Sequence, residues 1–240
     1  MSIPRVVIAS GPCTRISALV AEHSIRKYTK DVEIIHTWDK DRPTAFGHPV
    51  PDKMPLTDAN RKENYPDPPK ADPTEFSFVR LWVPELCGKS GKAIYMDSDQ
   101  ILMADITEMW NLSMGQHAVL QFRDTSVLLI DCEKCAGWNA WDVALRCKKR
   151  NAYGPEIMTL DNEPRIGMGP QEWNMPDRYD SNTKLLHYTK RQTQPGMTMP
   201  GSHRFEAPWY QLLGECVEQG IVKAEELNVC MKAGLEKYCE

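Results

Sequence analysis

Short apolar runs and one amphipathic segment alternate at the start of the chain. Residues 4–10 and 32–38 are largely apolar stretches of strand length, which predicts two buried strands. Between them, over residues 15–28, apolar positions recur at helical spacing, which predicts an amphipathic helix. Strand, helix and strand in this order predict a βαβ unit, with parallel strands and a right-handed crossover.

The alternation of strands and helices continues through the rest of the chain. It predicts strands at residues 93–96, 101–102, 119–122, 127–130 and 185–189, and helices at residues 74–86, 104–110, 138–149 and 209–217. The polar residues 123–126 are expected to form a loop between two of these strands. Together the elements predict an α/β fold, with helices flanking a mostly parallel mixed sheet.

Residues 40–73 break the pattern, because prolines and charged residues recur throughout them. We interpret this segment as a surface loop insertion and a candidate lid. The length of 240 residues is compatible with one large domain or two small ones.

Composition narrows the class of protein without identifying it. With 41% hydrophobic and 26% charged residues, the chain falls in the ordinary globular range. A net charge of −4 gives no reason to expect nucleic-acid binding. No stretch approaches the roughly 18 apolar residues of a membrane span, and the first apolar run is too short for a signal peptide. We therefore expect a cytoplasmic protein, with its eight cysteines mostly as free thiols.

The stretch Asp97-Ser98-Asp99 carries the clearest candidate chemistry. It follows a predicted buried strand, and ligands of open α/β sheets bind beyond the carboxyl ends of strands. Paired carboxylates there suit a hard divalent cation. Arg80 precedes this strand and is either a cation aimed at phosphate or the ion-pair partner of Glu75 or Glu85.

Several motifs in order resemble the signature of retaining GT-A glycosyltransferases. The resemblance is to the glycogenin and bacterial lipopolysaccharide galactosyltransferase family, family 8. The matching stretches are Arg80-Leu-Trp-Val-Pro-Glu-Leu86, Ile94-Tyr-Met-Asp-Ser-Asp99, Asp105-Ile-Thr-Glu-Met-Trp110, Gly169-Pro-Gln-Glu-Trp-Asn174 and Leu185-Leu-His-Tyr-Thr189. This resemblance implies a single Rossmann-like GT-A domain over residues 1–240, with the 40–73 insertion and C-terminal helices at 200–240.

The resemblance also implies a reaction and a set of site residues. The implied reaction is metal-dependent transfer of a sugar, with retention, from a nucleoside diphosphate donor, most often UDP-linked, to an acceptor hydroxyl. A glycan, a lipid-linked acceptor and a protein acceptor all stay open. The implied metal ligands are Asp97, Asp99 and His187, and the mixed carboxylate and imidazole set suits Mn²⁺ better than Mg²⁺. The implied donor contacts are Ala9, Ser10, Gly11, Arg80, Asp97, Ser98, Lys190 and Arg191.

The chain departs from the family pattern at three places. Asp124-Thr125-Ser126 replaces an Asn-x-Gly, and Glu156 is the only carboxylate where an Asp-Gln pair is expected. Asp124 and Glu156 are therefore the candidate sugar-facing, catalytic groups. Gln194-Pro195-Gly196 replaces a Lys-Pro-Trp that contacts the diphosphate, which leaves Lys190 or Arg191 to supply that cation.

Two other functions stay open. A haloacid-dehalogenase-type phosphatase also places Asp-x-Asp after a strand, although Gln100 follows the pair here. A noncatalytic sugar-nucleotide or glycan-binding protein would share the fold without the reaction. Trp173 and Trp209 flank the site in sequence and are candidates for stacking on an acceptor sugar.

Overall fold

A computed structural model describes residues 2–11, 14–37, 79–140, 142–143, 146 and 155–239. The 40–73 insertion and the predicted helix start at residue 74 lie outside these residues. Within the helix predicted at 138–149, the described residues 140, 142, 143 and 146 are helical.

The predicted βαβ unit is confirmed. Strand β1 spans Arg5–Ala9, helix α1 spans Arg15–Tyr28 and strand β2 spans Glu33–His36. The helix has the predicted bounds, because its apolar positions bury one face. β1 and β2 pair in parallel, as the short helical crossover requires.

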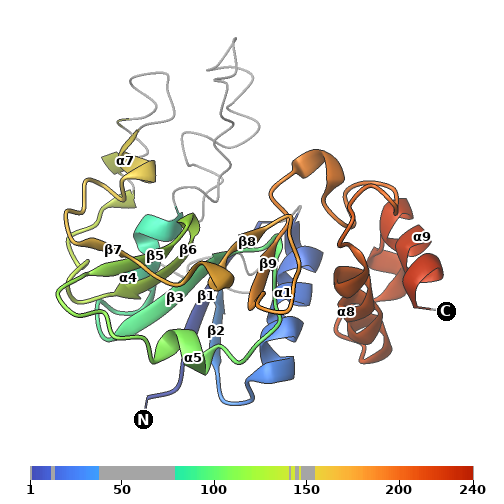
Figure 1. The fold of residues 1–240 in the computed structure, drawn as a ribbon, viewed down its shortest axis with the longest axis horizontal. Coiled ribbons are helices and arrows are strands. Elements are labelled where there is room, and N and C mark those ends of the chain that lie inside the picture. Colours follow the sequence, from blue (N-terminus) through green and yellow to red (C-terminus); the bar gives the residue numbers. More distant parts are fainter. Residues whose placement is uncertain are drawn as a thin grey trace.

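The described strands include a six-stranded sheet in the order β2-β1-β3-β6-β5-β7 (Figure 1). Its other strands are β3 (Lys92–Asp97), β5 (Val119–Phe122), β6 (Asp124–Asp131) and β7 (Ile166–Met168). Among these described strands only β6 runs against the rest, pairing antiparallel with β3 and with β5. The sheet is therefore mostly parallel and mixed, as predicted.

The prediction of a loop at residues 123–126 is wrong. Strand β6 begins at Asp124, and β5 turns into it through Arg123, whose φ of 71° lies in the left-handed region. The polar residues Asp124, Thr125 and Ser126 lie in the strand because tertiary hydrogen bonds from Arg80 and Asn174 satisfy their side chains. Local polarity therefore mispredicts this end of the strand.

Both faces of the large sheet are buried, and alternate strand residues enter different cores. On one face Val7, Ala93 and Leu128 pack beneath helices α4 (Val83–Leu86) and α7 (Pro155–Met158). On the other face the neighbouring strand residues pack beneath α1 and α5 (Thr107–Trp110). Each large apolar side chain buried in this way contributes about 1.5–3 kcal/mol to stability.

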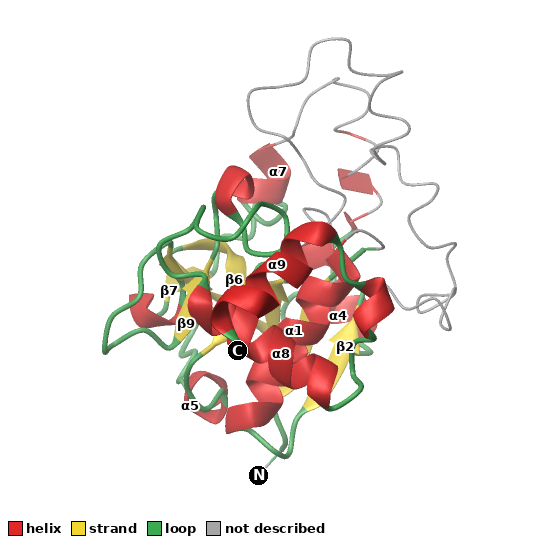
Figure 2. Cartoon of the chain, turned by 90° about the vertical axis from the view of Figure 1, so that its right-hand side faces the viewer, coloured by secondary structure: helices red, strands yellow, loops and turns green. Residues whose placement is uncertain are grey.

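A small second sheet lies beside the first, in the order β4-β9-β8. Its strands are β4 (Gln100–Leu102), β8 (Met175–Pro176) and β9 (Leu185–His187). A third apolar cluster joins it to α1 and to the C-terminal helices α8 (Ala207–Glu218) and α9 (Val229–Tyr238). Figure 2 shows α1, α8 and α9 together in front of the strands. Short 3₁₀ turns lie at Arg80–Trp82 (η3), Gln171–Trp173 (η4), Arg191–Thr193 (η5) and Ala224–Glu226 (η6).

Two further findings concern the described residues only. None of the helices that they form is long and apolar enough to cross a membrane. The described cysteines, at positions 87, 132, 135, 216, 230 and 239, are all free thiols, as expected.

Candidate metal centre

Two sheets bring the predicted metal ligands together. Asp97 is the last residue of β3, and the two-residue turn at Ser98 and Asp99 leads directly into β4. β4 pairs with β9 so that Gln100 lies opposite His187, and Tyr188 N–H donates to Asp99 O over 3.0 Å. One ligand atom each from Asp97, Asp99 and His187 lies within 4.8 Å of the others.

The electron-pair donors of this cluster fit a divalent cation. Asp99 Oδ1 is buried and, among the described residues, has no hydrogen-bond partner, with His187 Nε2 3.4 Å away. Native proteins rarely leave a buried acceptor without a partner, and a bound cation would satisfy this oxygen. Two carboxylates and an imidazole form a mixed shell that Mn²⁺ accepts readily.

Asp97 is held from two sides. Tyr95 Oη donates to its Oδ1 over 2.5 Å, and Arg80 Nη2 lies 3.9 Å from the same oxygen. Burial raises the pKa of Asp97 to about 6, with Arg80 opposing the rise and the Asp99 carboxylate adding to it. The site therefore carries like charges that a bound cation would neutralise.

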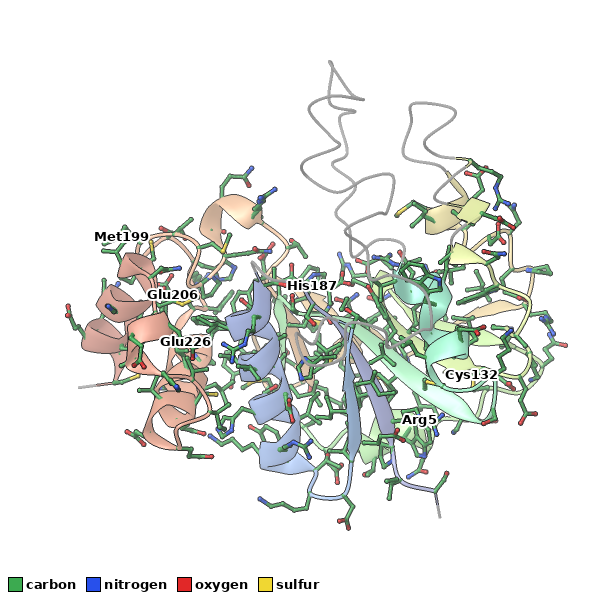
Figure 3. All side chains as sticks on the ribbon, turned by 180° about the vertical axis from the view of Figure 1, so that it is seen from behind. Arg5, Cys132, His187, Met199, Glu206 and Glu226 are labelled. Carbon is green, nitrogen blue, oxygen red and sulfur yellow. The ribbon has the colours of Figure 1, made fainter. Side chains whose placement is uncertain are left out.

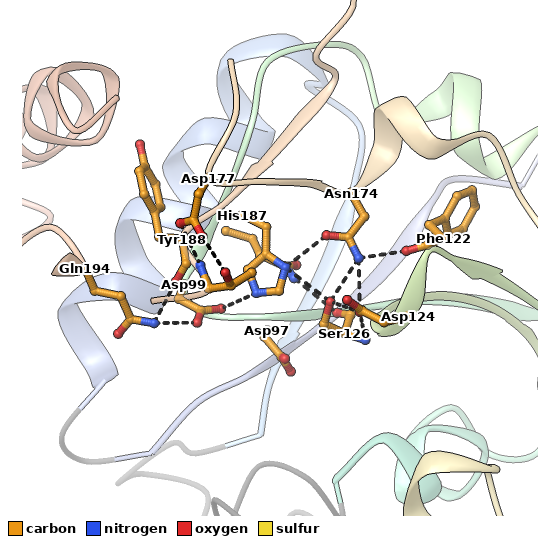
Figure 4. Close-up of polar contacts among 12 residues, drawn as sticks. Asp97, Asp99, Phe122, Asp124, Ser126, Asn174, Asp177, His187, Tyr188 and Gln194 are labelled. Atoms are coloured by element: carbon orange, nitrogen blue, oxygen red, sulfur yellow. Dashed lines mark hydrogen bonds and ion pairs between the residues drawn. The ribbon is translucent and has the colours of Figure 1, made fainter. Parts of the chain in front are cut away.

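The ring of His187 is buried, with Asn174 and Ser126 beside its Nδ1 and the Asp99 carboxylate beside its Nε2. Its Nδ1 lies 2.9 Å from Asn174 Oδ1 and 3.3 Å from Ser126 Oγ (Figure 4). Burial alone would lower the pKa of His187, but Asp99, Asp97 and Asp124 outweigh that effect and raise it. The side chain is fixed in place rather than free to rotate.

The structure places the predicted sugar-facing group Asp124 in the surroundings of His187. Its Oδ1 accepts from Ser126 N over 2.9 Å and from Asn174 Nδ2 over 3.1 Å. Its neighbour Thr125 accepts a hydrogen bond from Arg80 Nη1. Residues 124–126, where the family pattern is broken, thus contact His187 through Ser126 and Arg80 through Thr125.

The predicted donor contacts at the end of β1 lie next to the cluster. Ala9 pairs with Asp97 in the sheet register, so Ser10 and Gly11 continue past the same edge. Thr37 closes this edge, accepting from Ser10 N over 2.9 Å and donating to Ser10 O over 3.0 Å. Figure 3 shows His187 toward this edge of the sheet and Arg5 toward the opposite one.

Other predicted residues are less closely grouped. Lys190 and Arg191 are exposed at η5, three and four residues beyond His187. Glu156 is buried in α7, which covers one face of the large sheet. Trp173 and Trp209 are 1% and 2% exposed, so they are core residues and not stacking platforms for a sugar.

Sequence reasoning misses two amides that contact the cluster. Asn174 ends one of the matching motifs, but no local pattern indicates that it contacts His187, 13 residues further on. Gln194 stands out only as a departure from the family pattern, yet its Nε2 donates to Asp99 Oδ2 over 2.7 Å. The broken motif is the one signal in the sequence for Gln194.

Comparisons with known proteins agree with this geometry. The profile of glycosyl transferase family 8 matches residues 22–155, more than half of the chain. A search of curated protein sequences found no match.

Solved structures share the fold at low sequence identity. The glycosyltransferase GlyE of Streptococcus pneumoniae TIGR4 is 15% identical with a TM-score of 0.63, over 92% of this chain and 64% of that one. The bifunctional glycosyltransferase WbbM is 15% identical with a TM-score of 0.62, over 92% and 51%. The galactosyltransferase LgtC, solved with donor and acceptor sugar analogues, is 12% identical with a TM-score of 0.61, over 88% and 95%. The chain thus spans about two thirds of GlyE and about half of WbbM.

Proposed function

The chain belongs to glycosyl transferase family 8, and from that premise we propose that it transfers a sugar from a nucleoside diphosphate donor to an acceptor hydroxyl. The donor is a UDP-sugar, and the anomeric configuration is retained, as in the family that the motifs resemble. The observation that carries the proposal is the Asp97, Asp99 and His187 cluster, with a buried Asp99 Oδ1 that no described residue hydrogen-bonds.

The chemistry of the transfer explains why such a cluster is useful. The leaving diphosphate gains negative charge as the glycosidic bond breaks, and a divalent metal stabilises charge on those oxygens. Asp97, Asp99 and His187 would hold that metal, with Mn²⁺ preferred over Mg²⁺. Arg80, 3.9 Å from Asp97, is a buried cation of the site, and Lys190 or Arg191 would supply another from η5.

The remaining site residues have proposed roles on the donor. Ala9, Ser10 and Gly11 would contact the base and ribose, because small residues let the donor approach the backbone. Ser98 lies in the turn between the two aspartates and would meet the donor beside them. The sugar itself would face Asp124 and Glu156. Asp124 is the better supported of the two, because it lies in the hydrogen-bond network of His187.

The test is donor binding and turnover in an Asp99→Ala variant. We expect the wild type to hydrolyse or transfer sugar from a UDP-sugar only with Mn²⁺, and the variant to lose that activity. The matched control, Asp31→Ala, removes an exposed carboxylate outside the site and should keep it. Activity in Asp99→Ala at wild-type metal dependence would refute the assignment.

A donor screen identifies the nucleotide. Thermal unfolding is followed with UDP-, GDP- and TDP-sugars, with and without Mn²⁺. A ligand at 100 times its Kd adds about 2.7 kcal/mol to apparent stability, so the correct donor gives a clear rise in Tm. Binding of UDP and Mn²⁺ without turnover against any acceptor would instead indicate a noncatalytic sugar-nucleotide-binding protein.

A further inference from the structure

Two groups that can only accept hydrogen bonds determine the orientation of the Asn174 side-chain amide. Its Nδ2 lies 2.7 Å from Phe122 O, a backbone carbonyl, and 3.1 Å from Asp124 Oδ1. If the amide were flipped, its oxygen would face two acceptors, so the NH₂ group must point there. Asn174 Oδ1 therefore points at His187 Nδ1, 2.9 Å away (Figure 4).

This arrangement fixes which ring nitrogen of His187 carries the proton. Ser126 Oγ donates to Asp124 Oδ1, so toward Nδ1 it too presents a lone pair. Both groups near Nδ1 are acceptors, and Asn174 Oδ1, 2.9 Å from Nδ1, is closer than the Asp99 Oδ1 that faces Nε2 over 3.4 Å. Because Asp99 Oδ1 forms no hydrogen bond with any described residue, the neutral ring carries its proton on Nδ1 and leaves the Nε2 lone pair toward Asp99.

Gln194 is oriented by the same kind of contact on the other side of the cluster. Its Nε2 donates to Tyr188 O over 2.8 Å, again a carbonyl that only accepts, and to Asp99 Oδ2 over 2.7 Å. One oxygen of Asp99 is thereby engaged, while Oδ1 stays buried without a hydrogen bond in the described part of the chain.

We infer that Asn174 and Gln194 are positioning residues. Each forms a hydrogen bond with one of the two possible ligand atoms of a metal-binding side chain and leaves the other atom free to bind the cation. Asn174 selects Nε2 of His187, and Gln194 selects Oδ1 of Asp99. The inference rests on the proposed metal site, and it explains why an amide stands at position 194. A neutral NH₂ donor orients Asp99 without adding a charge that would repel the metal.

The first experiment needs neither metal nor donor. The ¹⁵N chemical shifts of the His187 ring are measured in chelator-treated protein, at a pH high enough for the ring to be neutral. We expect Nδ1 to be protonated in the wild type and the ring to lose this preference in Asn174→Leu. The matched control Asn182→Leu changes an exposed asparagine and should keep the wild-type spectrum.

A second variant covers the case in which Asn174→Leu does not fold. Ser126→Ala removes the other acceptor near Nδ1 and keeps Asn174 Oδ1 in place, so the proton should stay on Nδ1. A wild-type ring protonated on Nε2, or a Ser126→Ala ring that switches to Nε2, would overturn the role of Asn174.

The second experiment titrates Mn²⁺ alone and counts the free ion by electron paramagnetic resonance. Removal of a residue that orients a metal ligand typically weakens metal binding about 10–100-fold, and we expect that loss in Asn174→Leu and Gln194→Leu. Gln192→Leu, at an exposed position in the same turn, is the control for Gln194 and should bind Mn²⁺ like the wild type. Unchanged Mn²⁺ affinity in folded Gln194→Leu would overturn its role.

The two experiments separate this inference from the proposed function. If the wild type bound Mn²⁺ but transferred no sugar, the positioning roles would stand and the reaction would fail. If the His187 tautomer were as expected but Mn²⁺ did not bind, the metal site would fail, and with it the role of Gln194.

Discussion

Replacing Asp97 by asparagine should make the metal-free protein more stable while it removes metal binding. Burial raises the pKa of Asp97 to about 6 from its ordinary 3.8, and a pKa difference of one corresponds to about 1.36 kcal/mol. The side chain is 23% exposed, so solvent screens part of this penalty and we expect a gain of about 1–3 kcal/mol. Asparagine keeps an acceptor for the Tyr95 hydroxyl, so the contact within β3 survives.

The sign of the pH dependence follows from the direction in which the pKa moves. An acid with a raised folded-state pKa holds its proton longer in the folded protein than in the unfolded chain. Its stabilising contribution is present below pH 3.8 and is lost as pH rises through about 6. The advantage of Asp97→Asn should therefore be absent near pH 3.5 and complete above about pH 7.

The assay is urea unfolding followed by tryptophan fluorescence, with chelator and with Mn²⁺. In chelator at about pH 7.5 the variant should unfold at higher urea, and Mn²⁺ should stabilise only the wild type. Asp105→Asn is the matched control, because hydrogen bonds from Thr107 and Thr29 outweigh burial and lower the pKa of Asp105, so this variant should gain nothing. A variant less stable than the wild type, or a gain that persists near pH 3.5, would refute the electrostatic explanation.

Three further predictions test other parts of the chain. Gly234→Ala should lower the free energy of unfolding by about 1–3 kcal/mol in urea, because a Cβ there overlaps the Tyr210 ring between α9 and α8. An unchanged urea midpoint would contradict this packing. Burial opposes ionisation of Glu22, but hydrogen bonds from His36 and Arg26 lower its pKa from the ordinary 4.5, so Glu22→Gln should cost about 1 kcal/mol at pH 7 and little once the pH falls below the lowered pKa. Burial raises the pKa of Cys216 to about 12, so mass spectrometry should find it alkylated only after unfolding.

The parts of the fold that sequence predicts well are those with a strong local pattern. Helix α1 and strands β1 and β5 agree with the prediction because their apolar patterns alone decide their conformation. Strand β7 escapes prediction because three residues with a central Gly167 give no alternation to detect. Strand β8 contains only two residues, one of them proline, and it exists because β9 pairs with it.

The candidate site divides in the same way. Asp97 and Asp99 are visible because they follow a clear strand, and the resemblance to a known motif order adds His187. The contacts that orient these ligands cannot be predicted locally, because they join residues far apart in sequence: 48 positions separate Asn174 from Ser126 and 95 separate Gln194 from Asp99. A local pattern contains no information about such pairs.

The C-terminal helices are linked to the proposed metal ligands through the segment that carries Gln194. Gln194 precedes Pro195 and Gly196, and Gly196 is held by two residues of the C-terminal region. Gly196 N–H donates to Tyr210 Oη in α8 over 3.0 Å, and Asn228 Nδ2 donates to Gly196 O over 2.9 Å just before α9. The segment that carries Gln194 is thus anchored on the helical layer, which packs in turn on β4 and β9 through Ile101 and Leu186. The C-terminal helices therefore fix both the strand that carries His187 and the amide that orients Asp99.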